Sequence, residues 1–191
     1  TLVEGWNFRQ VRAALAKHEK IEQTLTGLSD SEVMDKLGHP GVFPEGRFFP
    51  DTYRFVRGMT DLELLKKSYN RLDDVLEQEW SKRAADAPYT DPYQALIMAS
   101  LVGKETGVPE ERGQIAGVFV RRLKIGMLLQ TDPTVIYGLG ERYTGKLTRA
   151  HLRESTPYNT YVISGLPPTP IAMIGSEAIH TPLNTVEGRR Q

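Results

Sequence analysis

Glu105 is the residue in this sequence best suited to acid–base chemistry. It follows an apolar run at 95–102, which predicts a buried helix over 92–105 that a glycine and a proline terminate. Burial and the negative end of the helix dipole would both favour the protonated form of its carboxyl group. A carboxylic acid that stays neutral near pH 7 is what general acid catalysis requires. The local pattern also fits a surface glutamate paired with Lys104 or Arg112.

Three other segments hold polar side chains in rigid or apolar surroundings. Residues 130–137 place polar groups between apolar residues, and in residues 156–170 prolines surround the polar groups. In residues 44–53 the polar groups lie among both apolar residues and prolines. Aromatic faces cover sugar rings, and amides, hydroxyls and carboxylates bond their hydroxyl and N-acetyl groups. Proline-rich loops also cap cores, so each segment has a structural interpretation too. The candidate substrate-binding residues are Gln130, Thr131, Asp132, Tyr158, Asn159, Thr160, Tyr161, Glu45 and Asp51.

Composition excludes several other functions. Lys plus Arg number 24, as do Asp plus Glu, so there is no positive excess for nucleic acid. The four histidines are scattered and there is no cysteine, so we expect no metal site and no organic cofactor. No run approaches the ~20 apolar residues that span a bilayer.

Capping and stop signals predict a helix-rich single domain over 1–191. Beyond Ser155 the prolines and glycines predict no regular element. The fold class is therefore α+β and predominantly helical, with short strands. Helices are expected after Asn7, after Ser29, after Thr60, from Pro92, from Pro109, from Pro133 with Asp132 as N-cap, and after Thr148. Capping boxes are expected at Ser29 and Thr60, and glycine stops at Gly38 and Gly126.

Taken in order, these segments resemble the endolytic murein transglycosylases of the MltG (YceG-like) family. The resemblance covers nearly all of the chain, and the run from Leu129 to Gly138 is its most specific part. The other matching runs are Leu2–Gly5, Glu45-Gly46, Phe49–Tyr53, Ala99–Val102, Lys104–Thr106, Val118-Phe119, Arg122-Leu123, Gly126-Met127, Tyr158–Tyr161 and Gly165–Pro168.

The resemblance implies a lysozyme-like helical core, with short strands and Pro/Gly-rich loops that line a cleft. It implies cleavage within nascent peptidoglycan strands, between N-acetylmuramic acid and N-acetylglucosamine, leaving 1,6-anhydro ends. Residues 1–191 would be a catalytic-domain fragment, preceded in the family by a single membrane helix and a LysM-like subdomain. That implies the bacterial inner membrane, with the catalytic domain in the periplasm and membrane contact only through the missing helix. Peptidoglycan strands are the expected partner, and peptidoglycan synthases are candidates.

The family motif usually reads Glu-Lys-Glu-Thr, and its second glutamate, the catalytic one, maps to Glu105. The first maps to Gly103, which departs from the pattern. Ile174-Gly175 departs from the usual Pro-Gly, and Asn184-Thr185-Val186 departs from the usual Asn-Pro.

A transglycosylase needs one carboxyl group, which first protonates the bridging oxygen and then deprotonates the 6-hydroxyl of the same sugar. Two alternatives stay open. A hydrolytic muramidase would pair Glu105 with Asp132 or Glu45 to activate water. A non-catalytic peptidoglycan-binding module would be consistent with Gly103.

Overall fold

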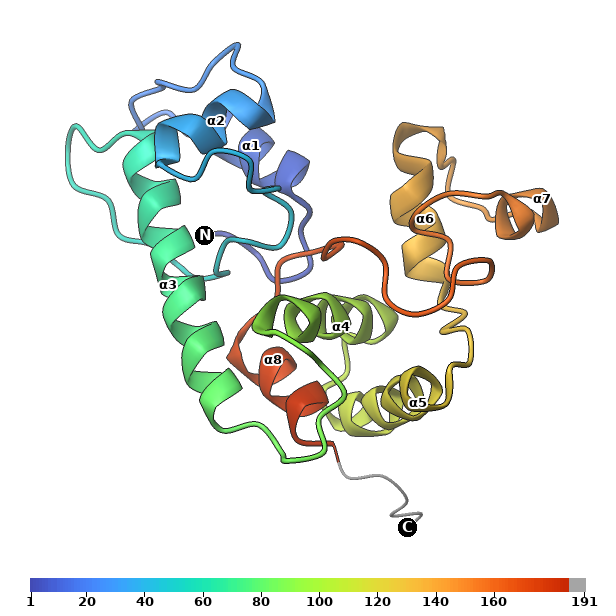
Figure 1. Cartoon of the computed structure of the whole chain (residues 1–191). Coiled ribbons are helices and arrows are strands. Elements are labelled where there is room, and N and C mark those ends of the chain that lie inside the picture. The colour runs from blue at the N-terminus through green and yellow to red at the C-terminus, as the bar shows by residue number, and fades with distance from the viewer. Residues whose placement is uncertain (186–191) are drawn as a thin grey trace.

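The computed structural model describes residues 1–185, and helices dominate them, which confirms the predominantly helical fold (Figure 1). The expected short strands reduce, in that part of the chain, to two isolated bridges, Leu2 with Asp51 and Glu22 with Thr60. The helices are α1 (Phe8–Ala16), α2 (Asp30–Leu37), α3 (Asp61–Ser81), α4 (Pro92–Glu105), η1 (Pro109–Glu111), α5 (Arg112–Ile125), α6 (Asp132–Leu139), η2 (Gly140–Arg142), α7 (Arg149–Arg153) and α8 (Ser176–Leu183).

Local signals set most helix boundaries. The predicted capping boxes at Ser29 and Thr60 are both formed, because each side chain accepts from the N3 backbone N–H and each N3 glutamate returns a bond. Gly38 and Gly126 end α2 and α5 in the left-handed conformation, as the stop signals predicted.

Two boundary predictions are wrong. Thr131, not Asp132, is the N-cap of α6, and it makes no side-chain cap bond because its hydroxyl is used elsewhere. The region after Ser155 does contain a helix, α8, which begins without a side-chain cap at Gly175 and carries Pro182 in its last turn. Its stability comes from buried packing against α3, α4 and α5.

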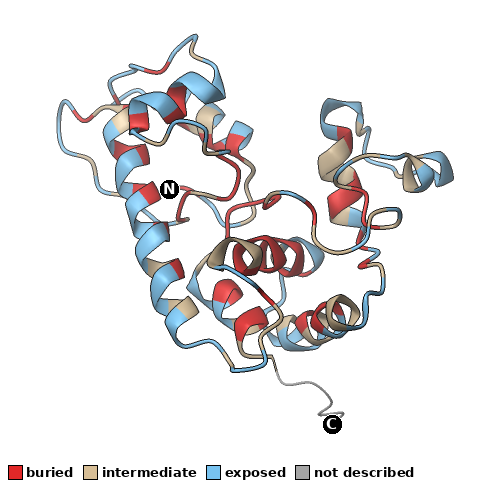
Figure 2. Ribbon diagram, viewed as in Figure 1, coloured by how far each residue is buried: buried red, intermediate tan, exposed pale blue. Residues whose placement is uncertain are grey.

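Two hydrophobic clusters divide the molecule into lobes. The N-terminal lobe packs α1, α2 and the first half of α3, and the central lobe packs α4, α5, α8 and the second half of α3. Helix α3 joins them, since Leu65 and Tyr69 lie in the first cluster and Leu72 and Leu76 in the second. Helix α4 is almost wholly buried at the centre of its lobe (Figure 2).

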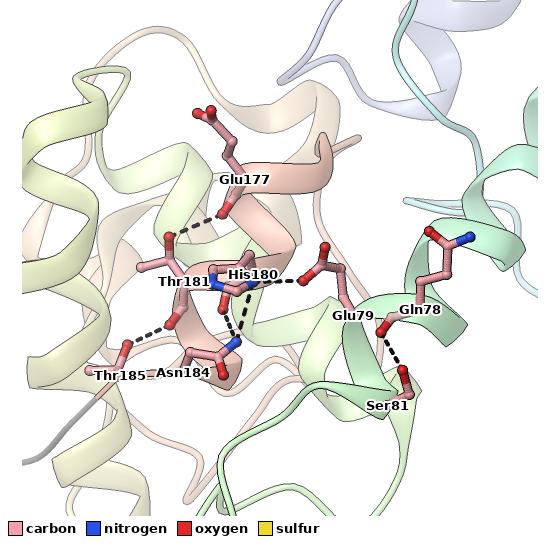
Figure 3. A network of polar contacts seen from close by, with 8 residues as sticks. All are labelled: Gln78, Glu79, Ser81, Glu177, His180, Thr181, Asn184 and Thr185. Atoms are coloured by element: carbon pink, nitrogen blue, oxygen red, sulfur yellow. Dashed lines mark hydrogen bonds and ion pairs between the residues drawn. The ribbon is translucent and has the colours of Figure 1, made fainter.

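Polar contacts fasten α8 to the end of α3 (Figure 3). His180 Nδ1 lies 2.7 Å from Glu79 Oε2, and Asn184 Nδ2 donates to the His180 carbonyl oxygen at 3.0 Å. The Thr181 hydroxyl donates to the carbonyl oxygen of Glu177. The His180–Glu79 contact links α8 to α3, and the other two bonds lie within α8 and its C-cap.

Helices α6 and α7, with η2 between them, form an arm (residues 132–153) whose ribbon is separated from those of α1 and α2 (Figure 1), although the Arg9 side chain of α1 pairs with Glu141 of η2. Helix α6 contacts α4, so the arm is anchored on the central lobe. The end of α4 and the start of α6 therefore meet, and the candidate residues meet with them.

Candidate active site

Glu105 is the last residue of α4 and its side chain is exposed. The helix boundary was predicted correctly, but the expected burial of the glutamate is wrong. The physical reason is that α4 leaves the core after Val102: Gly103 is half-buried and Lys104 is exposed. The carboxylate is therefore accessible to a large substrate from solvent.

One short hydrogen bond holds this carboxylate. The hydroxyl of Thr131, itself only 2% exposed, donates to Glu105 Oε2 at 2.6 Å. A hydroxyl that is fixed in the protein interior and bonded to a charged acceptor orients that acceptor. The residue that precedes α6 thus sets the direction of the Glu105 side chain.

Thr131 is in turn held by the loop at 156–163. Its backbone N–H donates to Thr160 Oγ1 at 3.0 Å, and Thr134 Oγ1 lies 2.8 Å from the same hydroxyl. The Gln130 N–H donates to the Thr160 carbonyl oxygen at 3.1 Å. The structure therefore brings together, at Glu105, two of the segments that the sequence singled out.

Gln130 adopts a backbone conformation that is rare for its residue type. Its φ is +52°, the only positive φ of a non-glycine residue within 1–185. The preceding carbonyl, of Leu129, accepts from Arg122 Nη1 at 2.7 Å. The exposed Gln130 side chain is thus held beside Thr131 by a fixed backbone.

Tyr161 and Asp132 form a second polar pair at this site. The Tyr161 hydroxyl donates to Asp132 Oδ1 at 2.5 Å. Burial, and then the carboxylates of Asp132 and Glu105, raise the pKa of Tyr161 to about 12, so its hydroxyl stays protonated at neutral pH. Asp132 is exposed and available to a ligand.

Asn159, Thr160 and Tyr158 have structural partners. The amide nitrogen of Asn159, which is fully buried, donates to the carbonyl oxygens of His151, Leu152 and Glu154. Its amide oxygen accepts from the Tyr161 N–H, and Tyr158 Oη lies 2.7 Å from Thr169 Oγ1. These contacts shape the loop that carries Tyr161.

Asp51 lies away from Glu105. It forms a bridge with Leu2, an ion pair with Arg71 at 3.7 Å, and part of a hollow over α3. The hollow is lined by Asp51, Thr52, Tyr53, Arg54, Lys67, Asn70, Arg71 and Asp74, none of which is in the Glu105 cluster. The structure therefore does not bring Asp51 to the site.

Glu45 lies in a groove between the N-terminal lobe and the arm. The groove has a volume of about 480 Å³, and Lys104, the neighbour of Glu105, lines it. Glu45 is 4% exposed, and burial raises its pKa to about 7 against the opposing effect of its hydrogen bonds. Of the other groove residues, Ile136 and Tyr137 lie in the segment 130–137 that the sequence singled out and Lys104 lies in the Lys104–Thr106 run, whereas Arg9 and Tyr143 were missed because they carry no local signal beyond their types.

Gly103 and Ile174, two of the positions where the resemblance implied departures from the family motifs, are neighbours. A Cβ placed on Gly103 would lie 3.2 Å from Ile174 Cγ2. The altered tail lies partly outside the described residues, since Val186 follows the last of them.

Residues 1–185 hold neither a cluster of side chains suited to a metal ion nor a helix suited to a membrane crossing. No group of three or more His, Cys, Asp or Glu side chains there is arranged to hold a metal ion. None of the helices in that range combines the length and the apolar character that a membrane crossing requires.

The chain belongs to the YceG-like family, which it matches over residues 1–189. It is 34% identical over 197 residues to an endolytic murein transglycosylase of Bacillus subtilis (strain 168), covering 92% of this chain and 52% of that protein. A protein of the same name from Streptococcus pneumoniae (serotype 2, strain D39) is 29% identical over 178 residues, covering 91% of this chain and 30% of the other. The chain thus spans 52% and 30% of the lengths of these relatives.

A crystal structure of a YceG-like protein from Listeria monocytogenes has a similar fold. It superposes with a TM-score of 0.75 at 28% sequence identity, covering 98% of this chain and 66% of that one.

Proposed function

We propose that this chain is the catalytic region of a lytic transglycosylase that cleaves peptidoglycan strands internally and leaves 1,6-anhydro-N-acetylmuramic acid ends. The observation that carries the proposal is an accessible carboxylate, Glu105, oriented by the buried Thr131 hydroxyl. The names of the relatives, endolytic murein transglycosylases, support the substrate and the reaction.

Glu105 acts twice in the proposed mechanism. It first donates a proton to the oxygen that bridges the two sugars, while the N-acetyl group of the substrate stabilises the positive charge that develops at the anomeric carbon. The Glu105 carboxylate then takes the proton of the 6-hydroxyl as that oxygen attacks the same carbon and closes the anhydro ring. The net change is one glycosidic bond broken and one formed within a single sugar, with the proton passed to the leaving hydroxyl. Proximity favours this intramolecular attack over water.

Substrate contacts are assigned to the polar groups that remain accessible. Gln130 and Asp132, which flank the Thr131 that holds Glu105, and Tyr161, which bonds Asp132, would bond ring hydroxyls and N-acetyl groups. Thr131 and the loop residues Tyr158, Asn159 and Thr160 would hold these groups in place. The groove that contains Glu45 would continue the cleft of a lysozyme-like core.

The whole protein is proposed to act at the cell wall. Residues 1–191 would form one catalytic domain of a longer protein, anchored in the bacterial inner membrane by a single preceding helix, with the catalytic domain in the periplasm. Peptidoglycan synthases are the proposed protein partners, since nascent strands are the proposed substrate.

A hydrolytic muramidase is the second candidate, because Asp132 is linked to the Glu105 site through Tyr161. Inverting glycosidases pair a general acid with a second carboxylate that activates water. The two reactions give different ends: a hydrolysed end is heavier than an anhydro end by one water.

The test is digestion of purified uncrosslinked glycan strands, with the new ends identified by mass spectrometry. Anhydro ends from the wild-type protein, and loss of cleavage with retained strand binding in Glu105→Gln, are expected, since general acid catalysis contributes about 10²- to 10⁴-fold. Glu110→Gln, an exposed glutamate on the following turn, is the matched control and should cleave normally. Undiminished cleavage by Glu105→Gln would remove Glu105 from the site. Hydrolysed ends would establish the muramidase, and binding without turnover in the wild type would indicate a binding module.

A further inference from the structure

Glu45 is a buried carboxylate for which the proposed mechanism has no chemical role. Its Oε2 accepts from the Phe8 backbone N–H at 2.6 Å. Phe8 is the first residue of α1, where the unpaired N–H groups and the helix dipole favour a carboxylate. One side of the groove is thus bonded directly to Glu45.

The other side of the groove reaches Glu45 through Tyr137 of α6. The Tyr137 hydroxyl lies close enough to the Glu45 carboxyl group to lower the pKa of that group, and its ring packs edge-on against Tyr158 with centroids 4.8 Å apart. Glu45 therefore bridges α1 and α6 from within the protein.

The backbone that carries Glu45 has little freedom to move. Gly46 has a φ of +72°, and a Cβ on it would lie 2.4 Å from Pro170 Cβ. Phe48 stacks on Phe8 with ring centroids 5.2 Å apart. A fixed turn and a fixed helix start make Glu45 a rigid reference point for α6.

Helix α6 transmits this constraint to the reacting group. Tyr137 lies on the helix that starts directly after Thr131, and Thr131 holds Glu105 Oε2. A short helix behaves as a rigid rod, so a shift at Tyr137 moves its N-terminal end as well. We propose that Glu45 is a positioning residue, which fixes α6 relative to α1 and thereby places the Thr131 hydroxyl and the Glu105 carboxylate for strand cleavage. This inference rests on the proposed function.

The surroundings of Glu45 link this bridge to pH. The side chain faces Tyr137 on α6 and Tyr158 on the following loop, and Tyr93 on α4 lies near both of these tyrosines; burial raises the hydroxyl pKa values of all three. The charged groups of the groove are Arg9 on α1, Asp30 on α2 and Lys104 on α4, and Arg47 lies over the Tyr93 ring. With the pKa of Glu45 at about 7, the carboxylate that accepts from both donors predominates only above that pH.

The test compares Glu45→Gln, Tyr137→Phe and the double variant in strand digestion from pH 5.5 to 8.5. At pH 8 we expect kcat to fall on the order of tenfold or more in each, with KM within about twofold, because small misplacement of a catalytic group has effects of this size. The double variant should be no slower than the singles, since both remove the same bridge. The ratio of wild-type to Glu45→Gln rates should decline toward one below pH 6, where Glu45 is mostly protonated.

Asp61→Asn is the matched control for loss of a buried carboxylate. Asp61 is 2% exposed and accepts from Thr24 and Leu25 in the N-terminal lobe, away from α6. It should change stability and leave kcat unchanged. A wild-type to Glu45→Gln ratio near one at every pH, or equal losses of kcat in Asp61→Asn and Glu45→Gln, would overturn the inference. Either result can occur while Glu105→Gln stays inactive, so the proposed function is tested separately.

Discussion

Glu105 and Glu45 are carboxylates held in opposite ways on neighbouring parts of the molecule. Glu105 is exposed at the end of a buried helix, and the hydroxyl of Thr131 donates a hydrogen bond to its carboxylate. Glu45 is 4% exposed and has a donor on each side, the Phe8 N–H and the Tyr137 hydroxyl. The difference indicates a division of labour: the group that must meet a polymeric substrate is accessible, and the group that fixes the framework is enclosed.

The largest effect is expected on stability, from Gly46→Ala, which disturbs the fixed turn next to Glu45. A left-handed backbone conformation and a Cβ 2.4 Å from Pro170 together should destabilise the fold by about 4 kcal/mol. Urea denaturation measures the change. Gly58→Ala is the control, since Gly58 also has a positive φ but has open space around it, and about 1 to 2 kcal/mol is expected there. Equal losses in the two variants would show that the Pro170 contact is unimportant.

Ionisation of Glu45 should give the second-largest effect, a change in stability that accompanies its effect on the rate. Its carboxyl group ionises near pH 4.5 when unfolded and, because of burial, at about 7 when folded, so stability is lost as pH rises between those values. The difference corresponds to about 3 kcal/mol. Denaturation across pH 4.5 to 8 should show this decline in the wild type and a smaller one in Glu45→Gln. Parallel curves for the two proteins would contradict it.

Thr131→Val should remove the hydrogen bond to the Glu105 carboxylate while preserving the shape of the side chain at position 131. Loss of a hydrogen bond to a charged group corresponds to roughly 1.5 kcal/mol, or about tenfold in kcat. Thr134→Val removes a hydroxyl that donates to the Thr131 carbonyl oxygen and bonds the Thr160 hydroxyl but does not contact Glu105, so it should slow cleavage less. If Thr134→Val were the slower enzyme, the Thr131 bond would not be what orients Glu105.

The smallest effect is expected where the two sides of the groove meet at the surface. Arg9 on α1 and Glu141 on η2 form an ion pair whose side chains are 74% and 76% exposed. Such pairs contribute little, so Arg9→Gln should change the free energy of unfolding by less than about 0.5 kcal/mol. A larger change that depends on salt concentration would mean that this surface ion pair, like Glu45, helps to fix the arm relative to α1.

The parts of the structure that sequence reasoning could predict depend on local chemistry. The capping boxes at Ser29 and Thr60 and the glycine stops at Gly38 and Gly126 are satisfied within a few residues, so they appear in the sequence directly. Helix α8 was missed because Gly175 and Pro182 are typical of loops, and its stability comes from tertiary packing.

The site was predicted in part for the same reason. The apolar run identified the helix that ends at Glu105. The point at which α4 leaves the core depends on tertiary packing, which the run itself does not reveal. No local pattern indicates that Glu45 is buried, because glutamates rarely are. Nothing in its segment shows that Asp51, six residues later, faces α3 instead.

The contact between positions 103 and 174 has a consequence for transplanting residues between relatives. The glycine and the isoleucine each look like an isolated oddity along the chain, yet a Cβ at the first would sit 3.2 Å from the second. They form one packing unit, with a small residue on α4 facing a branched one before α8. Introducing the glutamate expected at position 103 should therefore be combined with introducing the proline expected at position 174, because a side chain added at 103 would press against Ile174 if that residue were kept.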